Sequence, residues 1–213
     1  MLTTYQPIAV SIVTGFLGAG KTTLLNRLLK EPELANTAVI INEFGEVSID
    51  HLLVEQASDG VIELSDGCLC CTVRGELVDT LADLIERMQT GRIAPLKRIV
   101  IETTGLADPV PVLQAVMGHP VLMQVLRLDG VVCVVDAVNG EATFDAHQEA
   151  IRQAAVADRL VVTKSELASE NDLEQLMRRL RRLNPSAPII ISDATMTASS
   201  LLQCGLYDPE TKT

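Results

Sequence analysis

A glycine-rich run from Gly15 to Thr22 contains residue types that together bind phosphate. It reads Gly-Phe-Leu-Gly-Ala-Gly-Lys-Thr, which is the spacing of a P-loop. Glycines let the backbone turn tightly enough for successive N–H groups to converge on phosphate oxygens. Lys21 would reach the β- and γ-phosphates, and the Thr22 hydroxyl would be a ligand of Mg²⁺. The run predicts a nucleoside triphosphate site formed by Gly15, Gly18, Ala19, Gly20, Lys21, Thr22 and Thr23.

An acidic residue, Glu102, directly follows the apolar residues 99–101. In P-loop enzymes an acid at the end of a neighbouring strand holds Mg²⁺ or its waters, and a nearby glycine, here Gly105, lets the backbone approach the γ-phosphate. A helix-capping or solvated carboxylate is the alternative for Glu102. Asp136 ends a later apolar run, and the sequence leaves open whether it binds metal or only forms a turn. The predicted catalytic residues are Lys21, Thr22 and Glu102.

A third polar group, Thr163-Lys164-Ser165-Glu166, follows the apolar residues 160–162, where GTPases carry Asn/Thr-Lys-x-Asp. A carboxylate at this place accepts hydrogen bonds from N1–H and the 2-amino group of guanine, which adenine does not offer. Glu166 keeps the charge of the usual Asp but adds a methylene, so either the loop lies further back or guanine selectivity weakens. The predicted base contacts are Thr163, Lys164 and Glu166, and a solvated Lys/Glu turn is the alternative.

Three cysteines, Cys68, Cys70 and Cys71, lie close enough in sequence to bind one soft cation together. A closed structural zinc site usually takes four ligands from two separated pairs, and the sequence holds no second Cys pair. We therefore expect an open metal site, completed by water, carboxylates or a distant histidine. Reversible disulfide chemistry and inert packing are the alternatives. His119 could supply the fourth ligand or be solvated, whereas Cys133, in an apolar run, is expected to be a small buried hydrophobe.

Short apolar runs rich in β-branched residues alternate with helical patterns along the chain. Such runs are typical of strands that are buried on both faces of a parallel sheet. The expected strands are residues 8–13, 38–42, 97–101, 130–135, 159–162 and 188–191, and the expected helices are 22–30, 76–90, 109–116, 144–155 and 171–183. Ser169 is expected to cap the last helix. The alternation predicts an α/β fold with a doubly wound, mostly parallel sheet, a P-loop NTPase three-layer sandwich with ligands at the carboxyl ends of the strands.

Composition excludes several classes of protein. The formal net charge is −11, aromatic residues make up 2%, and Trp is absent, so the sequence lacks the basic surface and the stacking platforms of a nucleic-acid binder. No apolar stretch approaches the roughly 18 residues of a membrane span, and the N-terminus has no basic region typical of a signal peptide. We expect a cytoplasmic protein without nucleic-acid or membrane partners.

Five segments, taken in order, resemble the CobW family of metallochaperone GTPases. The resemblance covers about residues 8 to 208, and the combination of a Cys-x-Cys-Cys signature with a P-loop is specific to that family. The segments are residues 15–23, Asn42-Glu43-Phe44-Gly45-Glu46, residues 67–71, residues 102–109 and residues 163–166.

The resemblance implies a Mg²⁺-dependent GTPase that binds GTP and GDP. It would hold zinc or a similar transition metal at Cys68, Cys70 and Cys71 and couple hydrolysis to metal delivery to a client metalloprotein. Further metal contacts in the family would fall on Glu43, Glu46 and His119. The family's usual C-terminal domain is not found in this sequence, so we expect a P-loop GTPase domain over residues 1–208 and the start of a linker over 209–213.

Two other functions use some of the same residues. A P-loop ATPase or small-molecule kinase would need an acceptor-binding lid with clustered arginines, and the cluster formed by Arg178, Arg179, Arg181 and Arg182 is better explained as a solvated helix face. A zinc reservoir or redox sensor would need little turnover, and the intact Lys21, Thr22 and Glu102 argue against a vestigial nucleotide site.

Overall fold

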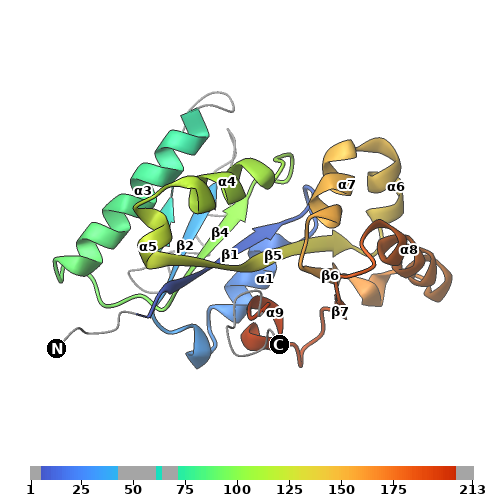
Figure 1. The fold of residues 1–213 in the computed structure, drawn as a ribbon. Coiled ribbons are helices and arrows are strands. Elements are labelled where there is room, and N and C mark those ends of the chain that lie inside the picture. Colours follow the sequence, from blue (N-terminus) through green and yellow to red (C-terminus); the bar gives the residue numbers. More distant parts are fainter. Residues whose placement is uncertain (1–5, 43–60, 64–71, 205–213) are drawn as a thin grey trace, which may run out of the picture.

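The computed structural model describes residues 6–42, 61–63 and 72–204, which form a seven-stranded sheet in the order β3-β2-β4-β1-β5-β6-β7 (Figure 1). Each pair of neighbouring strands runs parallel. The strands are β1 Ile8–Thr14, β2 Thr37–Asn42, β3 Val61–Glu63, β4 Arg98–Thr103, β5 Leu126–Asp136, β6 Arg159–Thr163 and β7 Ile189–Ile191. The helices are α1 Lys21–Leu28, α3 Thr72–Gln89, α4 Val110–Gly118, α5 Leu122–Val125, α6 Gly140–Ala146, α7 Gln148–Ala155, α8 Glu170–Leu183 and α9 Ala198–Leu202, with 3₁₀ turns η1 Pro32–Leu34 and η2 Ser165–Leu167.

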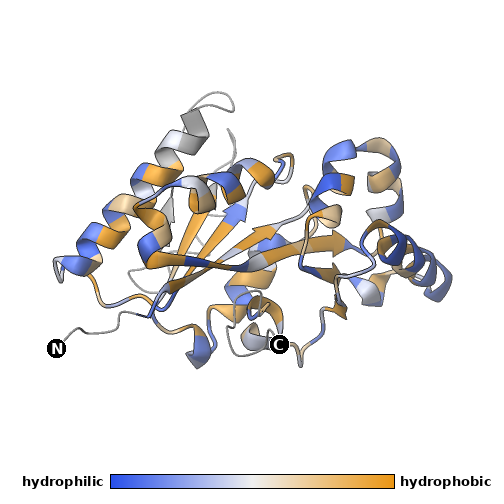
Figure 2. Cartoon of the chain, in the orientation of Figure 1, coloured by the Kyte–Doolittle hydropathy of each residue, from blue (hydrophilic) through white to orange (hydrophobic). Residues whose placement is uncertain are grey.

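Helices cover both faces of the sheet, which makes three layers (Figure 1). In β5, Val131 joins the core under α3 and α4, and Cys133 and Val135 join the core under α6, α7 and α8. The alternate residues Val132 and Val134 pack on the opposite side with α1 and α9. Because both faces are covered, the strands are apolar at nearly every position, and Figure 2 shows them mostly orange. The predicted α/β fold is confirmed.

Sequence reasoning located the long elements and missed or merged short ones. All six expected strands are present, and β3 was missed because its three residues give no recognisable pattern. The single helix expected over 144–155 is wrong. His147 has an extended backbone, with φ −132° and ψ 114°, so α6 ends before it and α7 begins after it. Within the described ranges no helix has the length and apolar character needed to cross a membrane.

The arginine-rich helix α8 is a structural and solvated element. Its cap is the predicted one, since the Ser169 side chain accepts a hydrogen bond from the backbone N–H of Asp172 at 3.2 Å. Arg179 lies over the Phe144 ring and pairs with Glu141 and Asp145 of α6, each at 2.7 Å. The rest of α8 is largely polar and appears blue in Figure 2. Arg179 therefore joins α8 to α6.

The amino ends of the central strands carry a partly buried ion pair away from the phosphate-binding loop. Arg98 of β4 lies 2.6 Å from the Asp129 carboxylate of β5 and donates to the carbonyl oxygen of Leu202 in α9 at 3.2 Å. Arg159 donates to the carbonyl oxygens of Ser200 and Gln203. Both cations lie at the carboxyl end of α9, where they satisfy helix carbonyls that lack intrahelical partners. These charges hold α9 against the sheet.

Candidate nucleotide-binding site

The glycine-rich loop connects the end of β1 to the start of α1 and has a backbone that favours glycine. Gly15, Gly18 and Gly20 have φ of 140°, 72° and 90°. A Cβ at Gly15 would overlap the carbonyl oxygen of Val134, so this position also needs glycine for space. α1 begins at Lys21, directly after the loop. The N–H groups of its first turn have no intrahelical partners, so the loop and helix together form a cradle for an anion.

An acid and a hydroxyl meet beside this cradle. β1 and β4 are neighbours, with Val13 opposite Glu102, so the end of β4 lies next to the start of the loop. The Thr22 hydroxyl donates to Oε1 of Glu102 at 2.7 Å, and Glu102 is only 4% exposed. Lys21 is also buried, at 8% exposed. Hydroxyl and carboxylate oxygens are the ligands that Mg²⁺ prefers, so Thr22 and Glu102 fit this ion.

The loop after β4 lies against the glycine-rich loop. A Cβ added to Gly105 would lie 2.5 Å from the backbone nitrogen of Leu17, so the two loops are in contact at this point. The side-chain amide of Gln153 on α7 donates to the carbonyl oxygens of Gly105 and Ala107, at 3.1 and 2.9 Å. Sequence reasoning missed Gln153. The signal that could have identified it is the placement of an amide side chain beside Ala154 on the buried side of α7, where apolar residues are expected.

The third polar group lies at the end of β6, on the other side of the glycine-rich loop. The Thr163 hydroxyl donates to the carbonyl oxygen of Ala19 at 2.7 Å. The Lys164 ammonium donates to the carbonyl oxygen of Gly18 at 2.8 Å and pairs with Asp136 at 2.7 Å. Glu166 lies exposed in η2. The structure therefore brings Thr163 and Lys164 to the loop that Gly18 and Ala19 belong to.

Asp136 both forms a turn and pairs with Lys164. Its carboxylate accepts hydrogen bonds from the backbone N–H groups of Val138 and Asn139 at 2.8 and 3.2 Å. Burial raises the pKa of Asp136, but the hydrogen bonds from Lys164, Asn139 and the two backbone groups outweigh burial and hold the pKa below its usual value. Asp136 is therefore ionised and fixes the Lys164 side chain. The pairing was missed, although Asp136 and Thr163 are opposite each other in the β5–β6 register.

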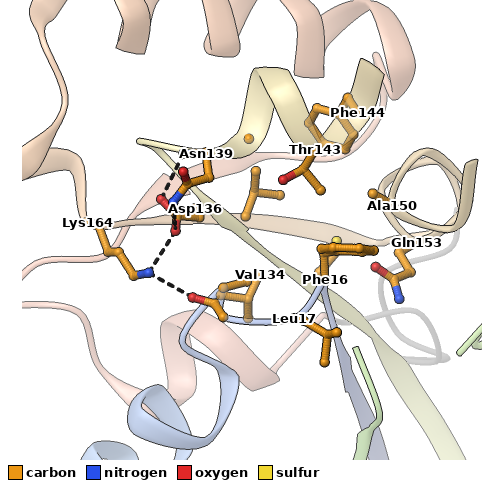
Figure 3. A pocket seen from close by; sticks show the side chains of 15 residues that line it. Phe16, Leu17, Val134, Asp136, Asn139, Thr143, Phe144, Ala150, Gln153 and Lys164 are labelled. Carbon is orange, nitrogen blue, oxygen red and sulfur yellow. Dashed lines mark hydrogen bonds and ion pairs between the residues drawn. The ribbon is translucent and has the colours of Figure 1, made fainter. Parts of the chain in front are cut away.

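A pocket of about 180 Å³ lies between the glycine-rich loop, the end of β5 and helices α6 and α7. Figure 3 shows Gln153 and Phe16 on one side of it and Lys164 with Asp136 on the other. Phe16 stacks on the His147 ring with 4.3 Å between centroids. Cys133 also lines the pocket and is 2% exposed, and burial raises the pKa of its thiol to about 12. Cys133 is thus the small buried hydrophobe that its sequence context predicts.

The predicted metal ligands lie mostly outside the described residues. The predicted ligands outside the described ranges are Cys68, Cys70, Cys71, Glu43 and Glu46. His119 follows α4, and its Nδ1 is buried without a hydrogen-bond partner among the residues that the structure describes. In residues 6–42, 61–63 and 72–204, no three His, Cys, Asp or Glu side chains are gathered closely enough to hold a metal ion. The predicted metal site therefore stays a prediction.

The contact at Gly105 predicts a loss of stability on substitution. Gly105→Ala would force its Cβ against the backbone of Leu17 and should lower the free energy of unfolding by about 1–3 kcal/mol, the usual cost of overpacking. Gly75→Ala is the matched control, because Gly75 is exposed in α3 and a Cβ there meets open space. The control should gain about 0.5–1 kcal/mol. Urea unfolding measures both, and equal values for the two variants would show that the loops do not touch.

Comparison with known proteins agrees with this geometry. Residues 9–191 match the family described as CobW/HypB/UreG, nucleotide-binding domain. The chain is 45% identical over 184 residues to the zinc chaperone YjiA of Escherichia coli. The aligned region covers 86% of this chain and 57% of that protein. It is 34% identical over 194 residues to the zinc-regulated GTPase metalloprotein activator 1 of Schizosaccharomyces pombe, covering 88% of this chain and 46% of that one.

Solved structures share the fold. The Zn(II)-bound YjiA GTPase from E. coli superimposes with a TM-score of 0.74 at 36% identity, over 95% of this chain and 63% of that one. The hydrogenase maturation factor HypB from Archaeoglobus fulgidus, at 22% identity and a TM-score of 0.58, is similar in fold alone. The chain spans about half the length of the curated relatives described above. With a family match over residues 9–191 and a relative 45% identical over 86% of its length, the chain belongs to the CobW/HypB/UreG family of nucleotide-binding domains.

Proposed function

We propose that this chain is the nucleotide-binding part of a Mg²⁺-dependent GTPase that binds zinc, or a similar transition metal, and couples GTP hydrolysis to delivery of the metal to a client metalloprotein. The observation that carries the nucleotide part is the 2.7 Å contact between the Thr22 hydroxyl and Glu102 beside the glycine-rich loop. The names of the E. coli and S. pombe relatives, a zinc chaperone and a zinc-regulated GTPase metalloprotein activator, support the metal part.

The residues around the glycine-rich loop would bind different parts of the Mg²⁺–triphosphate. Backbone N–H groups of the loop would hold phosphate oxygens, and Lys21 would place its charge near the β- and γ-phosphates. Thr22 and Glu102 would hold Mg²⁺, which when bound supplies positive charge to the β- and γ-oxygens. The Gly105 backbone, held against Leu17, would lie where a γ-phosphate can be sensed. Phosphoryl transfer needs this positioning and charge more than it needs covalent chemistry from the protein.

Guanine would be recognised at the end of β6. Lys164 is held by Gly18 and Asp136, so its stem can pack on a base while its ammonium stays on the loop. Glu166 would accept hydrogen bonds from N1–H and the 2-amino group of guanine. Because η2 holds Glu166 at the surface, its longer side chain has room to turn toward the base.

Competition binding tests the guanine assignment. GTP should bind at least about tenfold more tightly than ATP in the presence of Mg²⁺, because adenine leaves the Glu166 carboxylate without donors. Glu166→Ala should remove most of this preference and leave ATP affinity nearly unchanged. Glu174→Ala, which removes an exposed carboxylate of α8, is the control and should keep the preference. Equal affinities of the unmodified chain for GTP and ATP would rule out guanine recognition.

Metal binding is proposed at Cys68, Cys70 and Cys71, with Glu43, Glu46 and His119 as further contacts. Thiolates favour zinc and other soft cations, and an incomplete ligand set suits an ion that must be passed on. The free cysteines of the described part of the chain, Cys133 and Cys204, have thiol pKa values raised by burial, so they are poor competitors for the ion. We place the protein in the cytoplasm, where cysteines such as the proposed metal ligands stay reduced.

A further inference from the structure

Gln153 is a polar side chain in a place that packing alone would give to an apolar one. It is 0% exposed, and the other side chains that α7 buries are Ala150 and Ala154. Burying an amide costs free energy unless its groups find partners, and a methionine would fill similar space without that cost. The Gln153 amide N–H groups do find partners, the carbonyl oxygens of Gly105 and Ala107, at 3.1 and 2.9 Å.

The two carbonyl oxygens that accept these hydrogen bonds indicate the role of the Gln153 amide. Both belong to residues 104–108, the loop that connects Glu102 at the carboxyl end of β4 to α4, and Gly105 is the residue in contact with Leu17. Only a side chain with two donors on one atom satisfies two neighbouring carbonyls in this way. The amide cannot turn over, because Oε1 would then face the carbonyl oxygens. Oε1 itself is buried and has no hydrogen-bond partner within the described ranges. Gln153 lines the pocket beside Phe16 (Figure 3).

α7 links the hydrogen bonds of Gln153 to the glycine-rich loop through the next strand, β6. α7 leads through three residues into β6, whose last residue, Thr163, is bonded to Ala19 of the glycine-rich loop. Gln153 therefore ties the loop after β4 to the same βαβ unit that carries the base-side residues. The 104–108 loop is held from two sides, by Leu17 and by α7.

We propose that Gln153 is a positioning residue that holds the 104–108 loop at the distance from the glycine-rich loop that γ-phosphate sensing and hydrolysis require. This inference rests on the proposed GTPase function for its consequence in turnover. Binding of the α- and β-phosphates depends on the glycine-rich loop and α1, whereas the Gln153 side chain donates its hydrogen bonds to Gly105 and Ala107 of the 104–108 loop. Loss of Gln153 should therefore affect kcat and the discrimination between GTP and GDP, and leave GDP affinity alone.

Two substitutions at this position separate hydrogen bonding from packing. Gln153→Met keeps length and apolar volume but removes both donors, and should lower kcat about tenfold with KM and GDP affinity within about twofold. Gln153→Glu keeps the shape but sets a carboxylate against two carbonyl oxygens, and should lower kcat about 100-fold. The preference for a GTP analogue over GDP should fall in the same order.

Asn184→Ala is the matched control for a merely structural role. Asn184 is a buried amide whose Nδ2 donates to the carbonyl oxygens of Ala154, Ala155 and Ala157, at the end of the same helix but away from the 104–108 loop. Its loss should lower the midpoint of thermal unfolding and leave kcat within about twofold of the unmodified chain. If Gln153→Met and Asn184→Ala lower kcat equally, Gln153 acts only through stability and the proposal is overturned.

Hydrogen exchange gives a readout that does not depend on turnover. The N–H groups of Leu106 and Ala107 donate to Thr104 within the loop, at 3.4 and 3.1 Å. In GDP-bound Gln153→Met their exchange should be about tenfold faster, while amides of residues 15–21 keep their rates. If the unmodified chain hydrolyses GTP and Gln153→Met matches it in both kcat and exchange, the proposal is wrong and the proposed function stands. If the unmodified chain shows no GTP hydrolysis, the proposed function fails, and the exchange rates alone decide whether Gln153 holds the loop.

Discussion

Lys21→Ala is expected to lower kcat for GTP hydrolysis by about 1,000-fold, because it removes the side-chain charge that we propose the glycine-rich loop places near the β- and γ-phosphates. Lys21 is the first residue of α1, and alanine is favourable in a helix, so the fold should survive. Steady-state release of phosphate in the presence of Mg²⁺ measures the loss, and thermal unfolding checks the fold.

Lys30→Ala provides the control for the change of charge. Lys30 is exposed and lies just beyond the other end of α1, so its removal should leave kcat within about twofold. Normal turnover by a folded Lys21→Ala variant would mean that the run from Gly15 to Thr22 does not bind the reacting phosphates, and the assignment of this loop would be withdrawn.

The parts of the site that the sequence predicts are those fixed by local chemistry. The glycine-rich loop needs particular residues at particular spacings, and Glu102 directly follows the apolar run 99–101, which marks it as lying near the carboxyl end of a strand. Parallel strands bring their carboxyl ends to one edge of the sheet, so the contact between Thr22 and Glu102 follows from topology. The six expected strands are recognisable for the same reason.

What could not be predicted depends on contacts between distant segments. Gln153 lies 48 residues from Gly105, and nothing in the local sequence of α7 states which carbonyls its amide will meet. Asp136 has the residue type of a turn former and does form a turn, so its pairing with Lys164 becomes visible only in the register of β5 and β6. The break between α6 and α7 also involves a distant contact. His147 has an extended backbone there, and its ring stacks on Phe16 of the glycine-rich loop.

Removal of one cysteine of the Cys-x-Cys-Cys group is the second change with a large expected effect. Cys68→Ser, Cys70→Ser or Cys71→Ser should each weaken zinc binding by about 100-fold or more, because a hydroxyl replaces a thiolate among few protein ligands. Competition with a chromophoric chelator under reducing conditions measures the affinity, and we expect one ion per chain.

Cys204→Ala is the control for the loss of a thiol. Burial raises the pKa of the Cys204 thiol to about 11, so this group is neutral near pH 7 and a poor metal ligand. Zinc affinity should therefore be unchanged in this variant. Tight zinc binding that survives all three serine substitutions would place the metal elsewhere and remove the basis for the proposed delivery.

Titration of zinc into the nucleotide-free, GDP-bound and GTP-analogue-bound chain tests the central claim, that one protein links the metal to the state of the nucleotide. The Cys group lies in sequence between Glu43 and the loop after β4, so a γ-phosphate that repositioned these segments would also move the proposed metal ligands. We predict that zinc affinity differs between the GDP and GTP-analogue states by about 5- to 150-fold, with a reciprocal effect of zinc on nucleotide affinity. Identical isotherms in all three states would contradict the account, because the metal and the nucleotide would then bind to the same chain without coupling.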